Sequence, residues 1–209
     1  MYRQVKTTPR KRPRQGRSKA TVDAILAATA RVLVKRGFDG LTTNAVAEAA
    51  GVSIGSLYQY FPNKEALVAA LIESHMNEKN ARILDRLASV ATLPMAQAVR
   101  AMIELTIENY GSEPELKRVI LEQIPRVGRL ARIMELYLGT QHLVKQLLTA
   151  RRDELAIDDP DTASYILVAA IEAIAHRAVF LHPERLRDPR LVDEATAMVT
   201  RYLGVSEGS

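Results

Sequence analysis

Residues 41–67 read LTTNAVAEAAGVSIGSLYQYFPNKEAL and predict two short helices on either side of a glycine. The tight turn between the helices falls at Gly51. Apolar or small residues on both sides recur at intervals that pack two helices crossing at a steep angle. These residues are Val46, Ala47, Ala50, Val52 and Leu57. Such spacing is typical of a helix-turn-helix motif, and it leaves the intervening polar positions free to face a ligand.

Cap residues mark where the helices of this region begin. Thr42 or Thr43 caps the first helix of the motif, to about residue 50, and Ser53 caps the second, to about residue 60. Asn63 then caps a long helix that runs from Lys64 to about residue 90. Before the motif, apolar spacing predicts a covering helix over about 18–36, which Gly37 ends.

Helical spacing continues to the end of the chain, and no convincing strand alternation interrupts it. The further helices are predicted at about 94–110, 113–123, 126–151, 159–181 and 189–203. We therefore predict an all-α chain of about nine helices. It divides into a disordered basic arm at 1–17, a three-helix helix-turn-helix DNA-binding domain at 18–63, and a helical ligand-binding and dimerisation domain at 64–205.

Positive charge is concentrated at the start of the chain. Residues 1–62 carry 11 Lys and Arg against 3 acidic residues, whereas the whole chain has a net charge of only +5. A basic N-terminal region followed by a mildly acidic remainder indicates that the N-terminal region binds a polyanion, most simply nucleic acid. The arm at 1–17 holds seven of these basic residues. It is either a solvated or cloning-derived tail, or an arm that follows phosphates or enters a minor groove.

Composition excludes several other classes of protein. The chain has no Cys, which removes disulfides, thiolate nucleophiles and cysteine zinc sites. No apolar run approaches about 20 residues and no secretory signal is visible, so we expect a cytoplasmic protein without membrane contact. The four His show no metal-type spacing, and neither a metal nor a cofactor is expected. No common catalytic motif is present, which leaves an enzyme as a remote alternative that needs a triad scattered in sequence.

The second helix of the motif has the composition of a DNA reader. A short helix fits the major groove, where base edges distinguish the four base pairs. Gly55 lets the backbone approach, Ser56 and Gln59 can donate and accept hydrogen bonds, and Ile54 can touch a thymine methyl group. A phosphate clamp is predicted around this centre from hydroxyls, a helix N-terminus and a cation. Its members are Thr42, Thr43, Tyr58, Tyr60 and Lys64. The cap residue Ser53 is a further candidate for DNA binding, whereas Leu57 and Phe61 are assigned to the core.

Residues 37–72, GFDGLTTNAVAEAAGVSIGSLYQYFPNKEALVAALI, resemble the DNA-binding domain of the TetR/AcrR family of transcriptional repressors. The resemblance covers about residues 18–75 and is carried by the glycine turn, the LY pair and the FPNKEAL run. It implies phosphate contacts at Thr42, Thr43 and Lys64, and a base contact within reach of Asn44. It also places Ile54, Gly55, Ser56, Tyr58 and Gln59 on the recognition helix. Tyr60 stands where many members have His, and Ile54 departs from the polar residue often found there.

The resemblance further implies a homodimer whose last two long helices form a four-helix bundle across a twofold axis. The sequence supports this independently, because residues 162–181, TASYILVAAIEAIAHRAVFL, are apolar on more than one face. A second apolar stripe follows at Leu191, Ala195, Met198, Val199 and Tyr202. The alternative is that both helices belong to a monomeric core.

A ligand cavity is predicted among the helices from 94 to 180, where adaptable apolar side chains combine with sparse polar groups. Glu172 and His176 lie four apart on one helix face, so they can pair with each other, hydrogen-bond a ligand or bind a metal. The full candidate set is Met102, Ile103, Thr106, Tyr110, Met134, Tyr137, Leu138, Gln141, Tyr165, Glu172 and His176.

Together these features predict a sequence-specific repressor that binds palindromic double-stranded DNA as a homodimer and is released by a small-molecule inducer, whose identity is open. The long helix from Lys64 is the natural lever between inducer and DNA. A DNA-binding activator and a non-sensing architectural protein are the alternatives.

Overall fold

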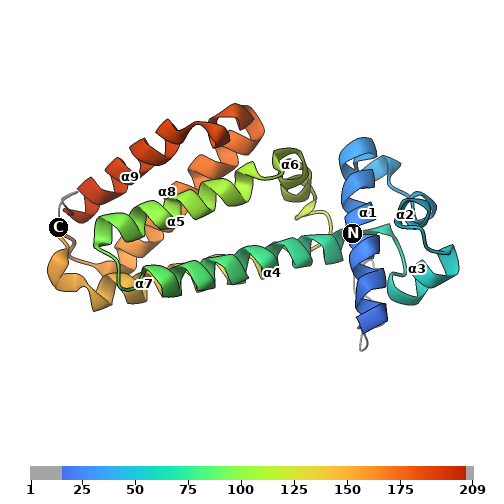
Figure 1. The fold of residues 1–209 in the computed structure, drawn as a ribbon, viewed down its shortest axis with the longest axis horizontal. Helices are drawn as coiled ribbons and strands as arrows, with labels where there is room; N and C mark the ends of the chain where they lie inside the picture. The colour runs from blue at the N-terminus through green and yellow to red at the C-terminus, as the bar shows by residue number, and fades with distance from the viewer. Residues whose placement is uncertain (1–15, 206–209) are drawn as a thin grey trace, which may run out of the picture. The chain divides into compact units, whose positions relative to one another are not determined.

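The computed structural model describes residues 16–205, apart from the side chains of residues 16, 17, 132 and 133. This range holds nine α-helices, two short 3₁₀ helices and no strand (Figure 1), which confirms the predicted all-α fold. Nearly all of the predicted basic arm at 1–17 lies outside the described residues. The helices are α1 (Gly16–Gly40), α2 (Thr43–Ala50), α3 (Ile54–Tyr60), α4 (Lys64–Val90), α5 (Met95–Gly111), α6 (Pro114–Gln123), α7 (Leu130–Ala150), η1 (Arg152–Glu154), α8 (Pro160–Leu181), η2 (Pro183–Arg187) and α9 (Pro189–Leu203).

Two predicted helix boundaries differ from those in the structure. The first helix reaches Gly40, although Gly37 breaks its regular geometry with a φ of 66° and a ψ of 178°. The predicted helix at 126–151 begins only at Leu130. A turn occupies its expected start, because the N–H of Arg129 bonds to the carbonyl of Ile124 and Gly128 has a φ of 67°. That left-handed conformation ends the preceding helical turn.

The chain forms two compact units. The first contains the chain up to Met76 together with Glu115–Ala131, and the second contains Asn77–Pro114 and Arg132 onward. The division therefore falls within α4, not at the start of α4 where the predicted boundary between 63 and 64 lies. Helix α4 contributes its first half to one unit and its second half to the other.

The helix-turn-helix in the first unit is built by its caps and its glycine. The Thr42 hydroxyl accepts the N–H of Ala45 at 3.2 Å and begins α2. Gly51 ends α2 in the left-handed conformation, with a φ of 66°. The next N–H, that of Val52, returns to the carbonyl of Ala47 at 3.0 Å, which completes a Schellman motif. No heavy atom lies within 4 Å of an added Cβ at Gly51, so its backbone conformation, not lack of space, requires glycine.

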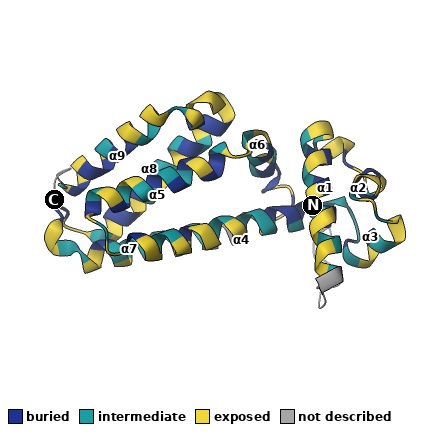
Figure 2. Cartoon of the chain, in the orientation of Figure 1, coloured by how far each residue is buried: buried dark blue, intermediate teal, exposed yellow. Residues whose placement is uncertain are grey.

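The core of the first unit is apolar and tightly closed. Its fully buried side chains come from α1, the helix-turn-helix and the first turns of α4; they include Ile25, Leu33, Leu41, Val46, Leu57, Phe61 and Leu67. In the second unit, α5 packs against both α8 and α9. Figure 2 shows dark buried bands on these helices, with exposed residues along their other faces.

Candidate nucleic-acid interface and ligand cavity

Helix α3 presents one buried and one exposed face. Leu57 within the helix is fully buried, and Phe61, its C-cap, has only 1% of its surface exposed. Both residues therefore belong to the core, as predicted. Ile54 and Tyr58 are about two-fifths exposed, and Gly55 and Gln59 are exposed as well. The residues predicted to read DNA thus share the surface that the core residues leave free.

Hydroxyl pairs fix this surface to its neighbours. The Thr43 hydroxyl lies 3.1 Å from that of Tyr58, and the Ser18 hydroxyl lies 3.0 Å from that of Tyr60. These contacts tie α3 to α2 and to α1. Each hydroxyl has one hydrogen and two lone pairs, so capacity for a phosphate remains after the pair has formed.

The two serines of α3 share a local network. Ser53 caps the helix by accepting the N–H of Ser56 at 3.1 Å, and the two hydroxyls lie 2.8 Å apart. The Ser56 side chain is therefore oriented by the cap residue. Asn44 and Gln59 are exposed, and neither side chain is hydrogen-bonded to another described residue.

Lys64 lies close to the end of α1. Its Nζ donates to the carbonyl of Phe38 at 3.1 Å and sits 4.7 Å from the centre of the Phe38 ring. Two of its three ammonium hydrogens remain for a phosphate. Arg126 stacks on the same ring, with its guanidinium 4.3 Å from the ring centre, and pairs with Asp39 at 3.0 Å. Sequence reasoning missed Arg126 because 87 residues separate it from Asp39.

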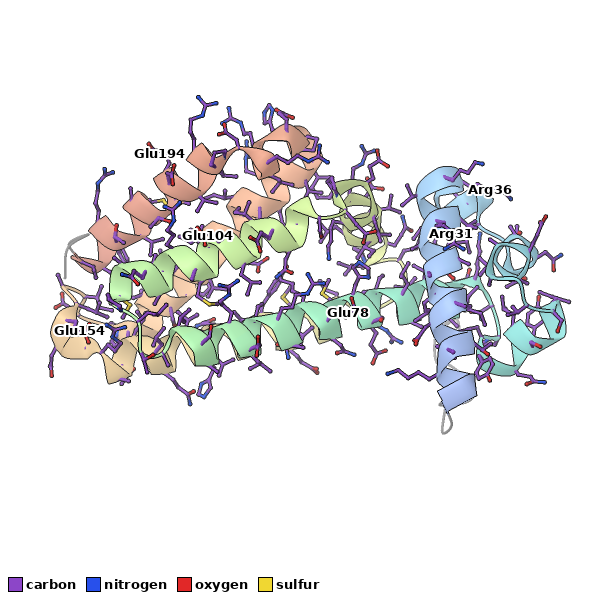
Figure 3. The ribbon with its side chains drawn as sticks, viewed as in Figure 1. Arg31, Arg36, Glu78, Glu104, Glu154 and Glu194 are labelled. Carbon is purple, nitrogen blue, oxygen red and sulfur yellow. The ribbon has the colours of Figure 1, made fainter. Side chains whose placement is uncertain are left out.

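A further arginine braces the helix-turn-helix from α1. Arg31, labelled in Figure 3, donates from Nη2 to the carbonyl of Ala49 at 2.9 Å. Ala49 lies in the last turn of α2, where carbonyls have no partner within the helix and attract a cation. This bond holds α2 against α1, close to the turn that leads to α3.

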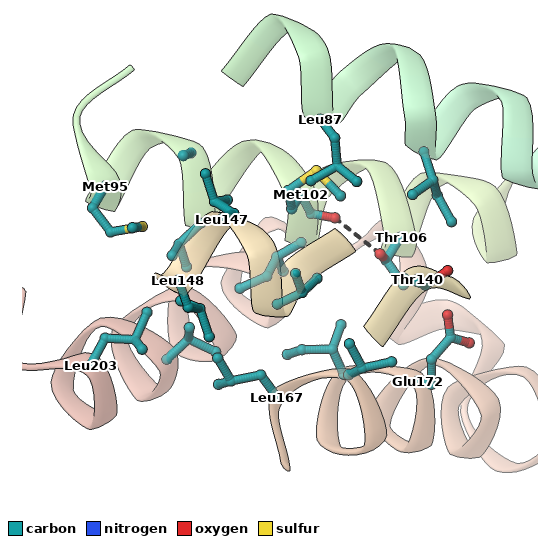
Figure 4. Close-up of a pocket in the computed structure, with 18 residues that line it drawn as sticks. Leu87, Met95, Met102, Thr106, Thr140, Leu147, Leu148, Leu167, Glu172 and Leu203 are labelled. Atoms are coloured by element: carbon teal, nitrogen blue, oxygen red, sulfur yellow. Dashed lines mark hydrogen bonds between the residues drawn. The ribbon is translucent and has the colours of Figure 1, made fainter. Parts of the chain in front are cut away.

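An apolar cavity of about 110 Å³ lies within the second unit. Figure 4 shows its walls, which come from α4, α5, α7, α8 and α9. Four of the predicted ligand residues line it: Met102, Ile103, Thr106 and Glu172. The sequence analysis missed the contributions of α4 and α9, which include Ile83, Leu87, Val199 and Leu203.

The other predicted ligand residues lie elsewhere. Met134, Leu138 and Tyr165 are exposed, with 45%, 64% and 61% of their surfaces open, and they do not line the cavity. Gln141 is also absent from its walls. An exposed apolar side chain and a core one give the same sequence signal when helical spacing is the only guide.

Comparison with known proteins identifies both parts of the chain. Residues 25–71 match the family model described as bacterial regulatory proteins of the tetR family. Residues 94–203, more than half of the chain, match the model of the tetracyclin repressor-like C-terminal domain. The chain belongs to the TetR family.

Individual relatives of this TetR-family protein are transcriptional regulators as well. The HTH-type transcriptional regulator EthR of Mycolicibacterium smegmatis is 31% identical over 101 residues, which are 48% of this chain and 46% of that protein. The match therefore spans less than half of that relative. The TetR-family protein is a DNA-binding transcriptional regulator, and its relatives are not enzymes.

Solved structures share the fold. A TetR-family regulator from Mesorhizobium loti superposes with a TM-score of 0.76 at 23% identity, covering 91% of this chain and 98% of that one. A complex of SmeT with triclosan gives a TM-score of 0.62 at 22% identity, covering 90% and 93%. Regulators of the TetR family bind DNA and small-molecule ligands and function as dimers.

In this TetR-family protein, a buried polar network adjoins one end of the cavity. The Nζ of Lys79 pairs with Glu172 at 2.7 Å and donates to the Tyr110 hydroxyl at 3.0 Å. Tyr110 in turn donates to the other Glu172 oxygen at 2.6 Å. Nε2 of His176 lies 2.8 Å from the Tyr110 hydroxyl and 3.3 Å from that of Tyr137. The ion pair is largely buried, with 11% and 13% of the two side chains exposed.

Burial keeps the rest of this network neutral. It raises the pKa of Tyr110, and it raises the pKa of Tyr137 to about 12, in both cases with a further contribution from the Glu172 charge. Burial also lowers the pKa of His176, against the opposing effect of Glu172. Because the single Tyr110 hydrogen points to Glu172, we assign the imidazole hydrogen to Nε2 of His176, which donates to the Tyr110 oxygen.

The last two long helices, α8 and α9, both expose large apolar side chains, and we call this set of residues the α8/α9 face. Its exposed large side chains are Tyr165, Ile166, Phe180, Leu181, Met198 and Tyr202. Within the described residues, α8 is the one helix long and apolar enough to cross a membrane, yet only 28% of its most apolar window is buried. A helix of a soluble protein passes the same test.

Proposed function

We propose that this TetR-family regulator is a repressor, which binds a palindromic operator as a homodimer and leaves it when a small molecule fills the cavity. The observation that carries the proposal is the course of α4. The helix that begins at Lys64, directly after the reader helix α3, also supplies Ile83 and Leu87 to the cavity wall. A ligand that displaces the cavity wall therefore acts on α4, the helix that directly follows the proposed DNA-reading helix α3.

The DNA side of the proposal rests on the exposed face of α3. Ser56 and Gln59 would hydrogen-bond to base edges and Ile54 would touch a thymine methyl group. Gly55 would let the backbone of α3 come close to the DNA. Thr42, Thr43, Ser53, Tyr58, Tyr60 and Lys64 would hold phosphates, and Asn44 would reach a base at the edge of the site. The excess of basic residues in this part of the chain supports the same assignment.

The dimer would form through the α8/α9 face. Pairing this face with its copy removes six large exposed side chains from water and produces the twofold symmetry that a palindrome requires. We place such a protein in the cytoplasm, where it meets DNA. We assign DNA binding to residues 18–63 and sensing and dimerisation to residues 64–205, although the two compact units divide within α4.

Release requires a difference in affinity between two states. To move the dimer from nearly all binding-competent to nearly all incompetent, an inducer must prefer the second state about 10⁴-fold, or about 5.5 kcal/mol. Burial of an apolar ligand in the cavity is a source of such preference when the cavity is wider in the released state.

The experiment is a reporter driven by a genomic fragment that the purified protein selects from duplex DNA. If the protein is a repressor, deletion of its gene raises reporter expression, and addition of an inducer raises reporter expression in the wild-type strain. Val144→Trp occupies the cavity with its own side chain and should abolish the response of the reporter to inducer. Reporter expression that falls on deletion identifies an activator, and expression that does not change identifies an architectural protein.

A further inference from the structure

We propose that the cavity selects an uncharged, largely apolar molecule with one hydrogen-bond-donating head, such as an alcohol or a phenol. The head would sit against Glu172, Thr106 and Thr140. This inference rests on the proposed function, because it specifies the chemical class of the inducer.

The polar groups of the cavity lie together. Figure 4 shows Thr106, Thr140 and Glu172 at one end, and Met95 and Leu203 at the other. The remaining wall is aliphatic, apart from the Met102 side chain. A ligand in this cavity therefore meets hydrogen-bonding groups at one end only, and the rest of its surface must be apolar.

The polar end offers acceptors, and its own donors are already occupied. The Thr106 hydroxyl donates to the Met102 carbonyl at 2.9 Å, and the Thr140 hydroxyl donates to the Leu136 carbonyl at 3.1 Å. Each hydroxyl has a single hydrogen, so only its lone pairs face a ligand. The Glu172 carboxylate is an acceptor as well. A head group without a hydrogen to donate would leave these acceptors unsatisfied, which weakens binding.

The charge at this end is already balanced. Lys79 neutralises Glu172 in an ion pair, with Nζ 2.7 Å from Oε1. A ligand ammonium would lose its hydration and meet a carboxylate that already has a cation. A ligand carboxylate would face three groups of acceptor oxygens. Each Glu172 oxygen accepts one hydrogen bond from Lys79 or Tyr110 and retains a lone pair for a neutral donor.

The size of the cavity limits the ligand. Its volume is about 110 Å³, whereas an engineered apolar cavity of about 150 Å³ is known to hold benzene. By this comparison the structure as it stands holds about four or five non-hydrogen atoms, and a seven-atom probe such as 1-hexanol needs a small outward movement of the walls. Larger molecules need the walls to move, which is the change that release requires.

The test measures binding of four probes to the full-length protein by calorimetry at pH 7.5, without DNA. The probes are 1-hexanol, its isomer methyl pentyl ether, hexanoate and hexylammonium. The two isomers have the same atoms, but only the alcohol has a hydrogen to donate. We expect 1-hexanol to bind about tenfold more tightly than the ether, the effect of one hydrogen bond. We expect both charged probes to bind more weakly than the alcohol.

Three valine variants locate the head group. Thr106→Val and Thr140→Val each remove an acceptor while keeping the shape of the side chain, and each should reduce the preference for alcohol over ether about threefold. Thr200→Val is the matched control. Thr200 is buried and donates to the carbonyl of Thr196 in the same manner, but it does not line the cavity. The Thr200→Val variant should prefer alcohol over ether as strongly as the wild type does. Thermal melts verify that all three variants fold.

The outcomes separate this inference from the proposed function. Equal binding of alcohol and ether, tighter binding of either charged probe, or binding of none of the four overturns the assigned ligand class. If 1-hexanol binds with the expected preference but does not weaken operator binding, the ligand class stands and inducer-driven release is overturned. If an unrelated compound releases the operator while 1-hexanol does not bind, release stands and the ligand class is overturned.

Discussion

At the scale of single residues, Gly55 separates the requirements of the fold from those of DNA binding. An added Cβ at this position meets only the Ser53 hydroxyl, at 3.9 Å, which is ordinary contact. The fold therefore has room for alanine. Glycine costs up to roughly 1 kcal/mol relative to alanine in a helix, so alanine in the first turn of α3 would be neutral or stabilising for the fold.

We predict that Gly55→Ala keeps or raises the melting temperature and weakens operator binding by about 1 kcal/mol or more, the effect of one lost base contact. The measurements are a thermal melt and fluorescence anisotropy with operator DNA. Gly139→Ala is the control, because it also has free space and lies on α7, away from the reader. A Gly55→Ala variant with unchanged operator affinity would contradict the close approach of α3 to DNA.

Gln59 and Lys64 should give different signatures in DNA binding. Gln59→Ala should change the preference among operator sequences by about 1–3 kcal/mol, because it removes a base contact. Lys64→Ala should weaken binding to all duplexes and reduce the salt slope by about 1. Titrations of specific and random duplexes at several salt concentrations measure both effects. Equal losses on the two duplexes for Gln59→Ala would remove Gln59 from the set of readers.

His176 makes the stability depend on pH. Burial lowers its pKa below the unfolded value of about 6.5, so the unfolded chain binds more protons in this range. Stability from this residue is present above about pH 6.5 and is lost as the pH falls below it. Urea unfolding at pH 7.5 and 5.5 should show a smaller difference for His176→Gln than for the wild type. An unchanged difference would mean that other groups govern this range.

Local residue roles were accessible from the sequence, whereas distant partners were not. The glycine turn and the burial of Leu57 and Phe61 follow from spacing over a few residues. The partner of Lys79 lies 93 residues away, and nothing in a helical pattern indicates that pairing. For the same reason the exposure of Leu138 was invisible, because an apolar residue has the same spacing in a core and on an uncovered face.

At the scale of helices, most boundaries could be predicted because caps and breakers act locally. Thr42, Ser53 and Asn63 each accept a backbone N–H at the start of their helix, at 2.8–3.2 Å. The predicted start of α7, directly after the break at Pro125, is too early, because the turns that begin at Ile124 continue to Gly128. The full lining of the cavity could not be predicted from the sequence, because five helices contribute its walls and their packing depends on distant contacts.

The Lys79–Glu172 pair joins α4 to α8 within the second unit. Removing one partner leaves a buried charge alone, so we predict that Lys79→Met lowers the free energy of unfolding by about 3 kcal/mol. The double variant Lys79→Met, Glu172→Leu should regain much of that loss, since both charges are gone. Urea unfolding of the four proteins in the cycle measures the coupling. A double variant as unstable as the sum of the two single changes would show that the charges do not act as a pair.

At the scale of the whole molecule, the uncovered α8/α9 face predicts how the protein assembles. Phe180→Asp places a charge in that face, and we expect it to shift the protein from dimer to monomer and to abolish palindrome binding. Sedimentation and anisotropy measure the two effects. Leu138→Asp is the control, since Leu138 is also exposed, at 64% against 43% for Phe180, but lies on α7. Retained dimers in Phe180→Asp, or monomers in Leu138→Asp, would move the interface to another surface.

Assembly through such a face ties gene control to the number of copies in the cell. Two chains must dimerise before either can bind a palindromic operator. The dimer concentration therefore grows with the square of the monomer concentration when the protein is scarce. A modest fall in synthesis, or dilution at cell division, then lowers operator occupancy by more than its own proportion. If the α8/α9 face forms the dimer as proposed, repression becomes sensitive to the concentration of the protein as well as to its ligand.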